Sequence, residues 1–327
     1  KKRSNDINER WGTSTKSHFG GLGFSFCTGI VIILLALFNL FPDYYHISFG
    51  LKGMTGEYKA FMGILFVIIF TSIAGILDEV ENLKPITKIL LQTVNSGIIL
   101  WAGFVIDITD NFIINYLFTV FWILLITNAV NMYDNIDFAL VSFAISLVII
   151  FLSLFYFNGY SISYLILFTS YLGCFLAFAY FNFYPSKLFM GDVGSFQIGG
   201  IFAAISIKVF WNEFEYSNNF TLFYNLLLHN LCFLVLLLDV AIVFIYRLKI
   251  GNNPFRGDTN HLSHVLSQYF NNSNLVTIGL AVITLLLGII YIFLSKISTF
   301  SEITNFTILI MSYFFTSSIL ILLYVIQ

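Results

Sequence analysis

The stretch Phe189-Met190-Gly191-Asp192-Val193-Gly194-Ser195 divides two long apolar runs, 164–183 and 197–211. It places a lone carboxylate between two glycines and a serine, in a chain that is 58% hydrophobic and only 10% charged. Glycine lets a backbone come close to a ligand, and carboxylate and hydroxyl oxygens suit a divalent cation or hydrogen bonds to phosphate. The stretch therefore predicts a polar site at a membrane boundary, with a helix-capping aspartate as the alternative.

Composition indicates a membrane protein. The 327 residues include 39 Phe and 18 Tyr, and the mean hydropathy is +0.89. Several apolar runs approach the roughly 20 residues that cross a bilayer, whereas soluble domains carry charge on about a quarter of their residues. The net charge of −2 does not favour nucleic-acid binding. The three cysteines, Cys27, Cys174 and Cys232, lie in apolar runs without metal-ligand spacing, so we expect them to pack in the core or to face lipid, and no disulfide compartment is implied.

We expect an all-α polytopic fold, because lipid offers no partner to unpaired backbone and the runs lack the alternation of a β-barrel. The ten expected transmembrane helices are 24–42, 59–77, 87–106, 112–130, 138–157, 164–183, 197–211, 223–245, 275–294 and 303–326. They form one integral-membrane domain, 1–327, with a basic segment at 1–22 and a substrate loop at 246–274. The chain starts at Lys1 without a signal-peptide pattern, so one more helix upstream is considered.

Lys and Arg residues concentrate on one side of this topology. If the segment 1–22 is cytoplasmic, that side collects eleven Lys and Arg residues and the other side collects three. The positive-inside rule then predicts a cytoplasmic N-terminus. The cytoplasmic connections become 78–86, 131–137, 184–196 and 246–274, and each carries acids, amides or histidines. Four such clusters on one face of a helical bundle predict a single active site.

The first of these clusters is acidic. Asp78 and Glu79 are adjacent carboxylates at an expected helix end, followed by Glu81. Residues three apart share a helix face, so we expect Asp78 and Glu81 to point together and Glu79 elsewhere. Close carboxylates raise one another's proton affinity unless a cation lies between them, which suits a general base or a metal site. A solvated acidic cap is the alternative.

The second cluster is a polar stripe. Asn128, Asn131, Asp134 and Asp137 recur at helical spacing at the end of an apolar helix. Burying four such groups is costly unless they bind something, which favours a binding site. A loop lying in water would remove that cost and is the alternative.

The loop 251–264 combines a cation, an acid and two histidines: Arg256, Asp258, His261 and His264. The His-x-x-His spacing suits zinc, but a third ligand of the right type is missing nearby. Arg and His donors suit a diphosphate better. The alternative is that the two histidines lie in a solvated loop and bind no ligand.

Asp239 is the deepest lone acid, inside the apolar run 223–245. Acids within a membrane face a polar interior and are paired or functional. We expect a structural role for Asp239, with Arg247 or Lys208 as its partner.

These segments resemble, in order, the motifs of the polyprenyl-phosphate N-acetylhexosamine-1-phosphate transferases. That family includes phospho-N-acetylmuramoyl-pentapeptide transferase and undecaprenyl-phosphate GlcNAc-1-phosphate transferase. The matching segments are Leu77-Asp-Glu-Val-Glu-Asn-Leu83, Asn128-Ala-Val-Asn-Met-Tyr-Asp-Asn-Ile-Asp137, the stretch 189–195 and Pro254-Phe-Arg-Gly-Asp-Thr-Asn-His-Leu-Ser-His264. The resemblance spans nearly the whole chain and includes His18-Phe-Gly-Gly-Leu-Gly23.

The resemblance implies a transferase that moves a sugar-1-phosphate, first of all N-acetylhexosamine-1-phosphate, from a UDP-sugar to polyprenyl (undecaprenyl) phosphate and releases UMP. It implies Mg²⁺ as cofactor, with Mn²⁺ as a substitute, and an active site on the cytoplasmic face of the bacterial inner membrane. The implied pathway is cell-surface polysaccharide synthesis, such as O-antigen assembly. The implied partners are UDP-N-acetylhexosamine, polyprenyl phosphate and membrane lipid, and a homodimer is considered.

The resemblance also implies roles for individual residues. Four carboxylates are expected to be catalytic: Asp78, Glu79, Asp134 and Asp192. Substrate-binding side chains are expected at Asn128, Asp137, Phe189, Arg256, His261 and His264. Asp192 and Asn131 are the expected magnesium ligands, and Phe189 is expected to stack on uracil. Asp78 and Glu79 would handle the lipid phosphate or its proton.

Five positions depart from the family's usual pattern. Glu79 and Asn82 stand where the family has aspartates, Ser263 where it commonly has a second histidine, and Asn135 and Phe138 where it has glycines. These departures predict a divergent sugar specificity. Two rival hypotheses are a multi-pass transporter, which would place polar groups near the membrane midplane, and a catalytically altered family member that acts as an assembly partner.

Overall fold

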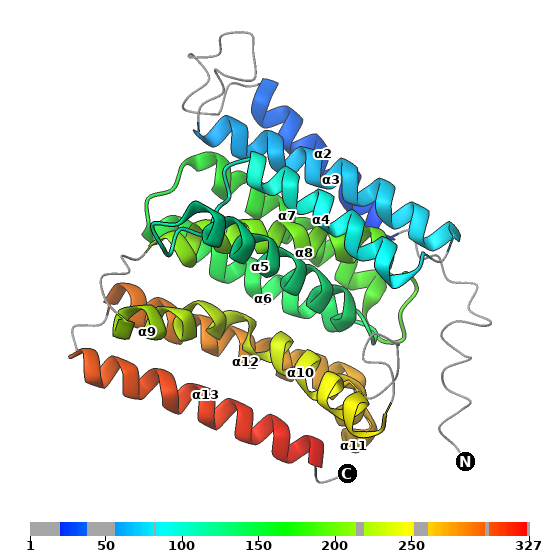
Figure 1. The fold of residues 1–327 in the computed structure, drawn as a ribbon. Helices are drawn as coiled ribbons and strands as arrows, with labels where there is room; N and C mark the ends of the chain where they lie inside the picture. The colour runs from blue at the N-terminus through cyan, green and yellow to red at the C-terminus, as the bar shows by residue number, and fades with distance from the viewer. Residues whose placement is uncertain are drawn as a thin grey trace.

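The computed structural model describes residues 20–37, 56–81, 83–213, 219–251, 261–297 and 301–325. In these ranges the long helices are α2 (Gly20–Leu37), α3 (Gly56–Glu81), α4 (Pro85–Trp101), α5 (Phe112–Tyr133), α6 (Ala139–Phe157), α7 (Ile162–Asn182), α8 (Gly191–Val209), α9 (Asn219–Asn230), α10 (Leu234–Lys249), α12 (Ser273–Ile292) and α13 (Glu302–Val325). They run side by side along a common direction (Figure 1). The shorter elements are η3 (Trp211–Glu213), η4 (Leu231–Phe233), α11 (Leu262–Phe270) and η5 (Phe293–Ile297).

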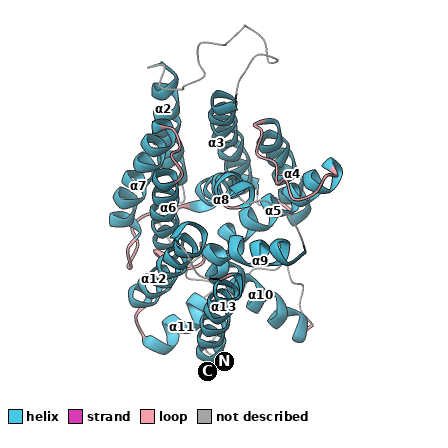
Figure 2. Cartoon of the chain, turned by 90° about the vertical axis from the view of Figure 1, so that its left-hand side faces the viewer, coloured by secondary structure: helices cyan, strands magenta, loops and turns pink. Residues whose placement is uncertain are grey.

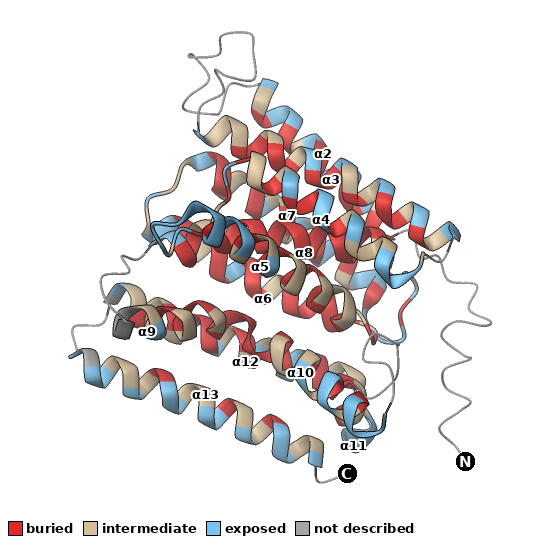
Figure 3. Cartoon of the chain, in the orientation of Figure 1, coloured by how far each residue is buried: buried red, intermediate tan, exposed pale blue. Residues whose placement is uncertain are grey.

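The expected all-α, polytopic membrane architecture is confirmed. Within the described ranges nine helices are long and apolar enough to cross a membrane, and α9, η4 and α10 together make one of them. Each of the ten expected spans overlaps one of these helices or the 17-residue α4. Exposed positions recur along the outer helices (Figure 3). Many of the exposed residues are large and apolar, including Phe26, Phe314 and Phe315, as lipid-facing residues are.

Helix α8 is the centre of the bundle. Figure 2 shows it between α3, α5 and α6, and nearly every residue from Val193 to Val209 is buried. A helix that is buried on all sides must be apolar or small-sided all round, and α8 meets this need with Gly, Ala, Ile and Phe. By contrast, α13 lies at the periphery, and only 17% of its span is buried.

Glycines fix the start of α8 against α2 and α3. The backbone N–H of Gly20 donates to the carbonyl of Phe189 (3.1 Å), and that of Gly21 donates to the carbonyl of Met190 (2.9 Å). A Cβ atom on Gly21 would clash with the backbone of Gly194, so only glycine allows α2 to come this close to α8. In the same way, a side chain on Gly75 in α3 would clash with the backbone at the start of α8. The two contacts hold the first turn of α8, and with it Asp192, in a fixed place.

The structure corrects three expected boundaries. Helix α3 continues to Glu81, so Asp78 and Glu79 lie in its last turns and not in a connection at 78–86. Helix α8 begins at Gly191, so Asp192 lies in a first helical turn and not in a loop at 184–196. The expected loop 246–274 contains the end of α10 and the short helix α11, while its residues 252–260 lie outside the described ranges.

Among the described residues, Cys27 is exposed on the outside of the bundle and Cys174 is half-buried, as expected for core or lipid-facing packing. Cys27, Cys174 and Cys232 are free thiols, and Cys232 is fully buried. Of the expected basic segment 1–22, the structure describes only the start of α2.

Candidate active site

The connection between α3 and α4 brings an acid and a base together. Helix α3 ends at Glu81 and α4 begins at Pro85, a residue suited to the first helical position. Because the connection is short, residues equally far from it on the two helices face one another. Asp78 and Lys88 are such a pair, each five positions from Leu83, whose N–H donates to Asp78 Oδ1 (3.0 Å).

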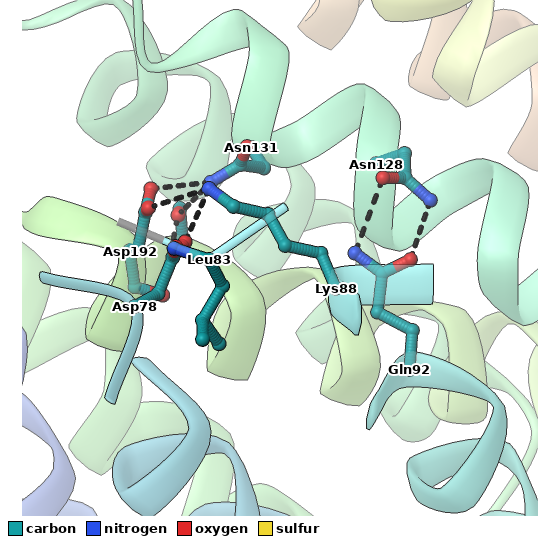
Figure 4. Close-up of polar contacts among 8 residues, drawn as sticks. Asp78, Leu83, Lys88, Gln92, Asn128, Asn131 and Asp192 are labelled. Carbon is teal, nitrogen blue, oxygen red and sulfur yellow. Dashed lines mark hydrogen bonds and ion pairs between the residues drawn. The ribbon is translucent and has the colours of Figure 1, made fainter. Parts of the chain in front are cut away.

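Lys88 joins two carboxylates from different helices. Its ammonium group forms an ion pair with Asp78 Oδ2 and a second one with Asp192 Oδ2, at 3.3 Å (Figure 4). On the far side of Asp192, Asn131 Nδ2 donates to Oδ1 at 2.8 Å and also to Ser195 Oγ at 2.8 Å. We call Asp78, Lys88, Asn131 and Asp192 the ion cluster. It joins the ends of α3, α4, α5 and α8.

The ion cluster and its neighbour Glu79 carry more negative than positive charge. Glu79 follows Asp78 in α3, and both of its carboxylate oxygens are buried beside the backbone of Asp192 and Val193 at the start of α8. Three carboxylates therefore stand against the one ammonium of Lys88. Carboxylate and amide oxygens in such excess fit a hard divalent cation. In the described part of the chain, however, no three His, Cys, Asp or Glu side chains are gathered closely enough to hold a metal.

Glu81 does not join this group. It is exposed, whereas Asp78 is 3% exposed. The expectation that Asp78 and Glu81 point together is wrong, because Gly75 sets the face of α3 that meets α8. Residues three and four positions after Gly75, namely Asp78 and Glu79, share that face, and Glu81 does not.

A second polar pair lies one helical turn deeper. Gln92 Nε2 donates to Asn128 Oδ1 (3.1 Å), and Asn128 Nδ2 donates to Gln92 Oε1 (2.6 Å) and to the carbonyl of Leu124 (2.8 Å). This reciprocal amide pair fixes α4 against α5 beside Lys88 (Figure 4). The side chain of Asn128, expected to bind substrate, is thus engaged with Gln92.

Sequence comparison identifies this arrangement. Residues 61–210, which hold the whole ion cluster, match glycosyl transferase family 4. This segment of the chain is therefore similar to that family. Phospho-N-acetylmuramoyl-pentapeptide-transferase of Streptococcus thermophilus is 32% identical over 214 residues, which are 59% of this chain and 61% of that protein.

Other relatives give the same result. The phospho-N-acetylmuramoyl-pentapeptide-transferase of Streptococcus agalactiae is 32% identical over 213 residues, 59% of this chain and 62% of that protein. That of Streptococcus pneumoniae is 31% identical over 225 residues, 62% of this chain and 63% of that protein. The chain thus spans about three fifths of the length of the curated relatives it matches.

Two further motif acids lie after α5. Asp134 caps the C-terminal end of α5, one turn after Asn131, and is half-buried. Asp137 accepts two hydrogen bonds from Ser186, from its N–H to Oδ2 (3.0 Å) and from its hydroxyl to Oδ1 (2.8 Å). Asp137 therefore braces the segment that leads to Phe189, whose own side chain is buried.

Three positions at which the chain departs from the pattern of family 4 have a physical explanation. Ser263 Oγ donates to Asn135 Oδ1 at 2.6 Å, and both side chains are buried, so two departures pair with one another. Phe138 has a φ of 67°, in the left-handed region that favours glycine. Its N–H donates to Asn182 Oδ1 (3.0 Å), and its ring packs on Phe183 with the centroids 5.0 Å apart. This hydrogen bond and ring contact thus hold Phe138 in a backbone conformation that only glycine would adopt without strain.

His261 lies beside the deep acid Asp239. His261 Nδ1 is 2.7 Å from Asp239 Oδ2, and the N–H of Leu262 donates to Asp239 Oδ1 at 2.6 Å. Asp239 thus has a partner that sequence reasoning did not indicate, since Arg247 or Lys208 was expected.

His264 and Arg256 are the other two residues expected to bind substrate in this loop. His264 lies one turn after His261 in α11 and is half-buried. Arg256 lies outside the described residues.

Sequence reasoning missed Lys88 as a site residue, because it counted Lys88 only toward orientation. The sequence did contain an indication: Lys88 and Asp78 lie equally far from the short connection between α3 and α4. Gln92 carried a similar signal, one turn after Lys88 on the same helix face.

Proposed function

We propose that the chain transfers a sugar-1-phosphate from a UDP-sugar to a polyprenyl phosphate and releases UMP. The observation that carries this proposal is the ion cluster, in which Lys88 lies between Asp78 and Asp192 at the meeting ends of four helices. The relatives named phospho-N-acetylmuramoyl-pentapeptide-transferase support the reaction class.

The chemistry requires positive charge at a membrane surface. An oxygen of the lipid phosphate attacks the β-phosphorus of the UDP-sugar, a new P–O bond forms, and the bond from that phosphorus to the bridging oxygen breaks. UMP leaves with the electron pair. Both substrates are anions, so the site must hold phosphates close together and stabilise charge on their oxygens. Lys88 is the described ammonium group at the centre of the site, and it can exchange its carboxylate partners for phosphate oxygens.

Carboxylate and amide oxygens are the kind of ligand that magnesium takes. We propose Asp192 and Asn131 as its ligands, and the buried carboxylate of Glu79 as a further source of negative charge beside it. When bound, the metal ion would neutralise phosphate oxygens. Asp78, held by Lys88 and the N–H of Leu83, would then keep Lys88 in place.

The remaining motif residues are proposed substrate contacts. Asp134 would meet the nucleotide at the end of α5, and Phe189 would offer its ring to uracil. His261, His264 and Arg256 would meet the diphosphate or the sugar. Asn128 and Asp137 are proposed to act beside these groups through Gln92 and Ser186, to which they are bonded.

We propose that this multi-pass protein works in a bacterial inner membrane with the ion cluster on the cytoplasmic side. The excess of Lys and Arg on that side supports the orientation. The transporter alternative calls for polar groups near the midplane. Against it, the ion cluster lies at helix ends, and the deep Asp239 is bonded to His261 from a connection after α10.

The test uses purified protein, Mg²⁺ or Mn²⁺, undecaprenyl phosphate and a panel of UDP-sugars, with UDP-N-acetylhexosamines first and 6-deoxy sugars second. We expect UMP release with at least one sugar, and loss of that release in Asp192→Asn. Lys59→Met, at the opposite end of α3, is the matched control and should retain turnover. A folded protein that releases no UMP with any sugar would favour the assembly-partner or transporter hypothesis.

A further inference from the structure

Both carboxylate oxygens of Asp239 contact the start of helix α11. Asp239 lies in α10 and is fully buried, with 0% exposure, and His261 is 4% exposed. Oδ2 meets the imidazole of His261, and Oδ1 accepts the N–H of Leu262, the first residue of α11. A carboxylate inside a membrane protein is costly unless its charge is compensated. Here the compensation comes from the junction at which α11 begins.

The carboxylate determines which nitrogen of His261 carries the proton. An ionised carboxylate accepts hydrogen bonds and cannot donate them. The short contact between Asp239 Oδ2 and Nδ1 therefore puts the proton on Nδ1 and leaves Nε2 for a ligand. When Nε2 also carries a proton, it can donate to a phosphate oxygen.

A second contact joins the same helical turn to the active site. Ser263, two residues after His261, donates to Asn135, which directly follows Asp134 at the end of α5. The first turn of α11 is therefore held from two sides, by Asp239 of α10 and by Asn135 beside α5. The α5 end also carries Asn131 of the ion cluster.

We infer that Asp239 is the positioning residue for His261: it fixes the ring and the proton on Nδ1, so that Nε2 faces the UDP-sugar and, once it also carries a proton, donates to a phosphate oxygen. The inference rests on the proposed function for the identity of that ligand. Carboxylates that orient metal-binding histidines change affinity or activity by about 10- to 100-fold when they are replaced, and we expect an effect of that order for Asp239.

The kinetic test is a double-mutant cycle with Asp239→Asn and His261→Gln. Each single variant should lower kcat/KM for the UDP-sugar by about 10- to 100-fold, mainly through KM if His261 contacts the bound diphosphate. The double variant should be no worse than His261→Gln alone, because Asp239 acts through His261. Ser206→Ala is the matched control: it removes a buried hydrogen bond from Trp122 Nε1 (2.9 Å) away from the site and should leave kcat/KM unchanged. A double variant that shows the product of the two single losses would overturn the inference.

A second measurement needs no substrate and no variant of Asp239. Nitrogen NMR of histidine-labelled wild-type protein, with the His261 signal assigned by its loss in His261→Gln, should show a neutral ring protonated on Nδ1. A neutral ring protonated on Nε2 would overturn the inference even if the enzyme is active. Absence of UMP release by the wild type would instead count against the proposed function and leave the NMR result to decide the role of Asp239.

Discussion

Lys88→Met removes the one ammonium group of the ion cluster and leaves Asp78, Glu79 and Asp192 close together. At the 3.3 Å separation of Lys88 Nζ and Asp192 Oδ2, the Coulomb term is about 5 kcal/mol at an effective dielectric constant of about 20. The two side chains are 31% and 33% exposed, so solvent screens their attraction. The variant also avoids the cost of desolvating the Lys88 ammonium group, which further reduces the loss of stability. We expect a loss of about 1–3 kcal/mol in the free energy of unfolding.

The assay is thermal unfolding of the purified protein in detergent, with EDTA or with Mg²⁺. In EDTA the unfolding midpoint of Lys88→Met should fall by about 2–6 °C, at roughly 2 °C for each kcal/mol in a chain of this size. Mg²⁺ should raise the midpoint of Lys88→Met more than that of the wild type, because a cation that binds the folded state stabilises it. UMP release should be lost in both conditions.

Lys59→Met is the control for removing a lysine from the same protein. Lys59 lies over the ring of Trp101, 5.7 Å from its centroid, near the other end of α3. Its replacement should give no Mg²⁺-dependent shift. Equal midpoints for wild type and Lys88→Met in EDTA, with the same response to Mg²⁺, would refute the charge reasoning for the ion cluster.

Three further changes test the packing around the site. Gln92→Leu leaves the amide of Asn128 without its two hydrogen bonds to Gln92, so the unfolding midpoint should fall by an amount that corresponds to about 1–3 kcal/mol; an unchanged midpoint would contradict this. Asn135→Ala and Ser263→Ala should show a coupling of about 1 kcal/mol in a double-mutant cycle of unfolding, and additive effects would mean that their hydrogen bond contributes little. Phe138→Gly removes the backbone strain of a non-glycine residue with positive φ, which should stabilise the protein by about 1–2 kcal/mol. It also removes a buried ring, which should destabilise the protein by about 3–5 kcal/mol. We expect net destabilisation, and a stabilised variant would show that strain outweighs packing.

The helices could be predicted from the sequence because the length of an apolar run is a local property. The convergence of the motifs at 78, 131 and 192 also followed from topology and agrees with the contacts of Lys88 with Asp78 and Asp192 and of Asn131 with Asp192. The start of α8 was placed too late, because the glycines at 191 and 194 have low helix propensity. Packing against Gly21 of α2 overrides that propensity.

Contacts that depend on helix rotation could not be predicted. Glu81 was expected to face the site, but the close approach of Gly75 to α8 turns it outward. The pairing of Asp239 with His261 depends on where a long connection returns to the bundle, which spacing along the chain does not encode. The bond between Asn135 and Ser263 joins positions 128 residues apart for the same reason.

The most direct test follows the phosphorus atom. UDP-sugar labelled with ³²P in the β-phosphate is incubated with the protein, Mg²⁺ and undecaprenyl phosphate, and the lipid is then extracted into organic solvent. Sugar-1-phosphate transfer predicts label in the lipid fraction and unlabelled UMP in the water, in equal amounts. Label that stays in the water as UDP, while the sugar enters the lipid, would contradict the proposed reaction.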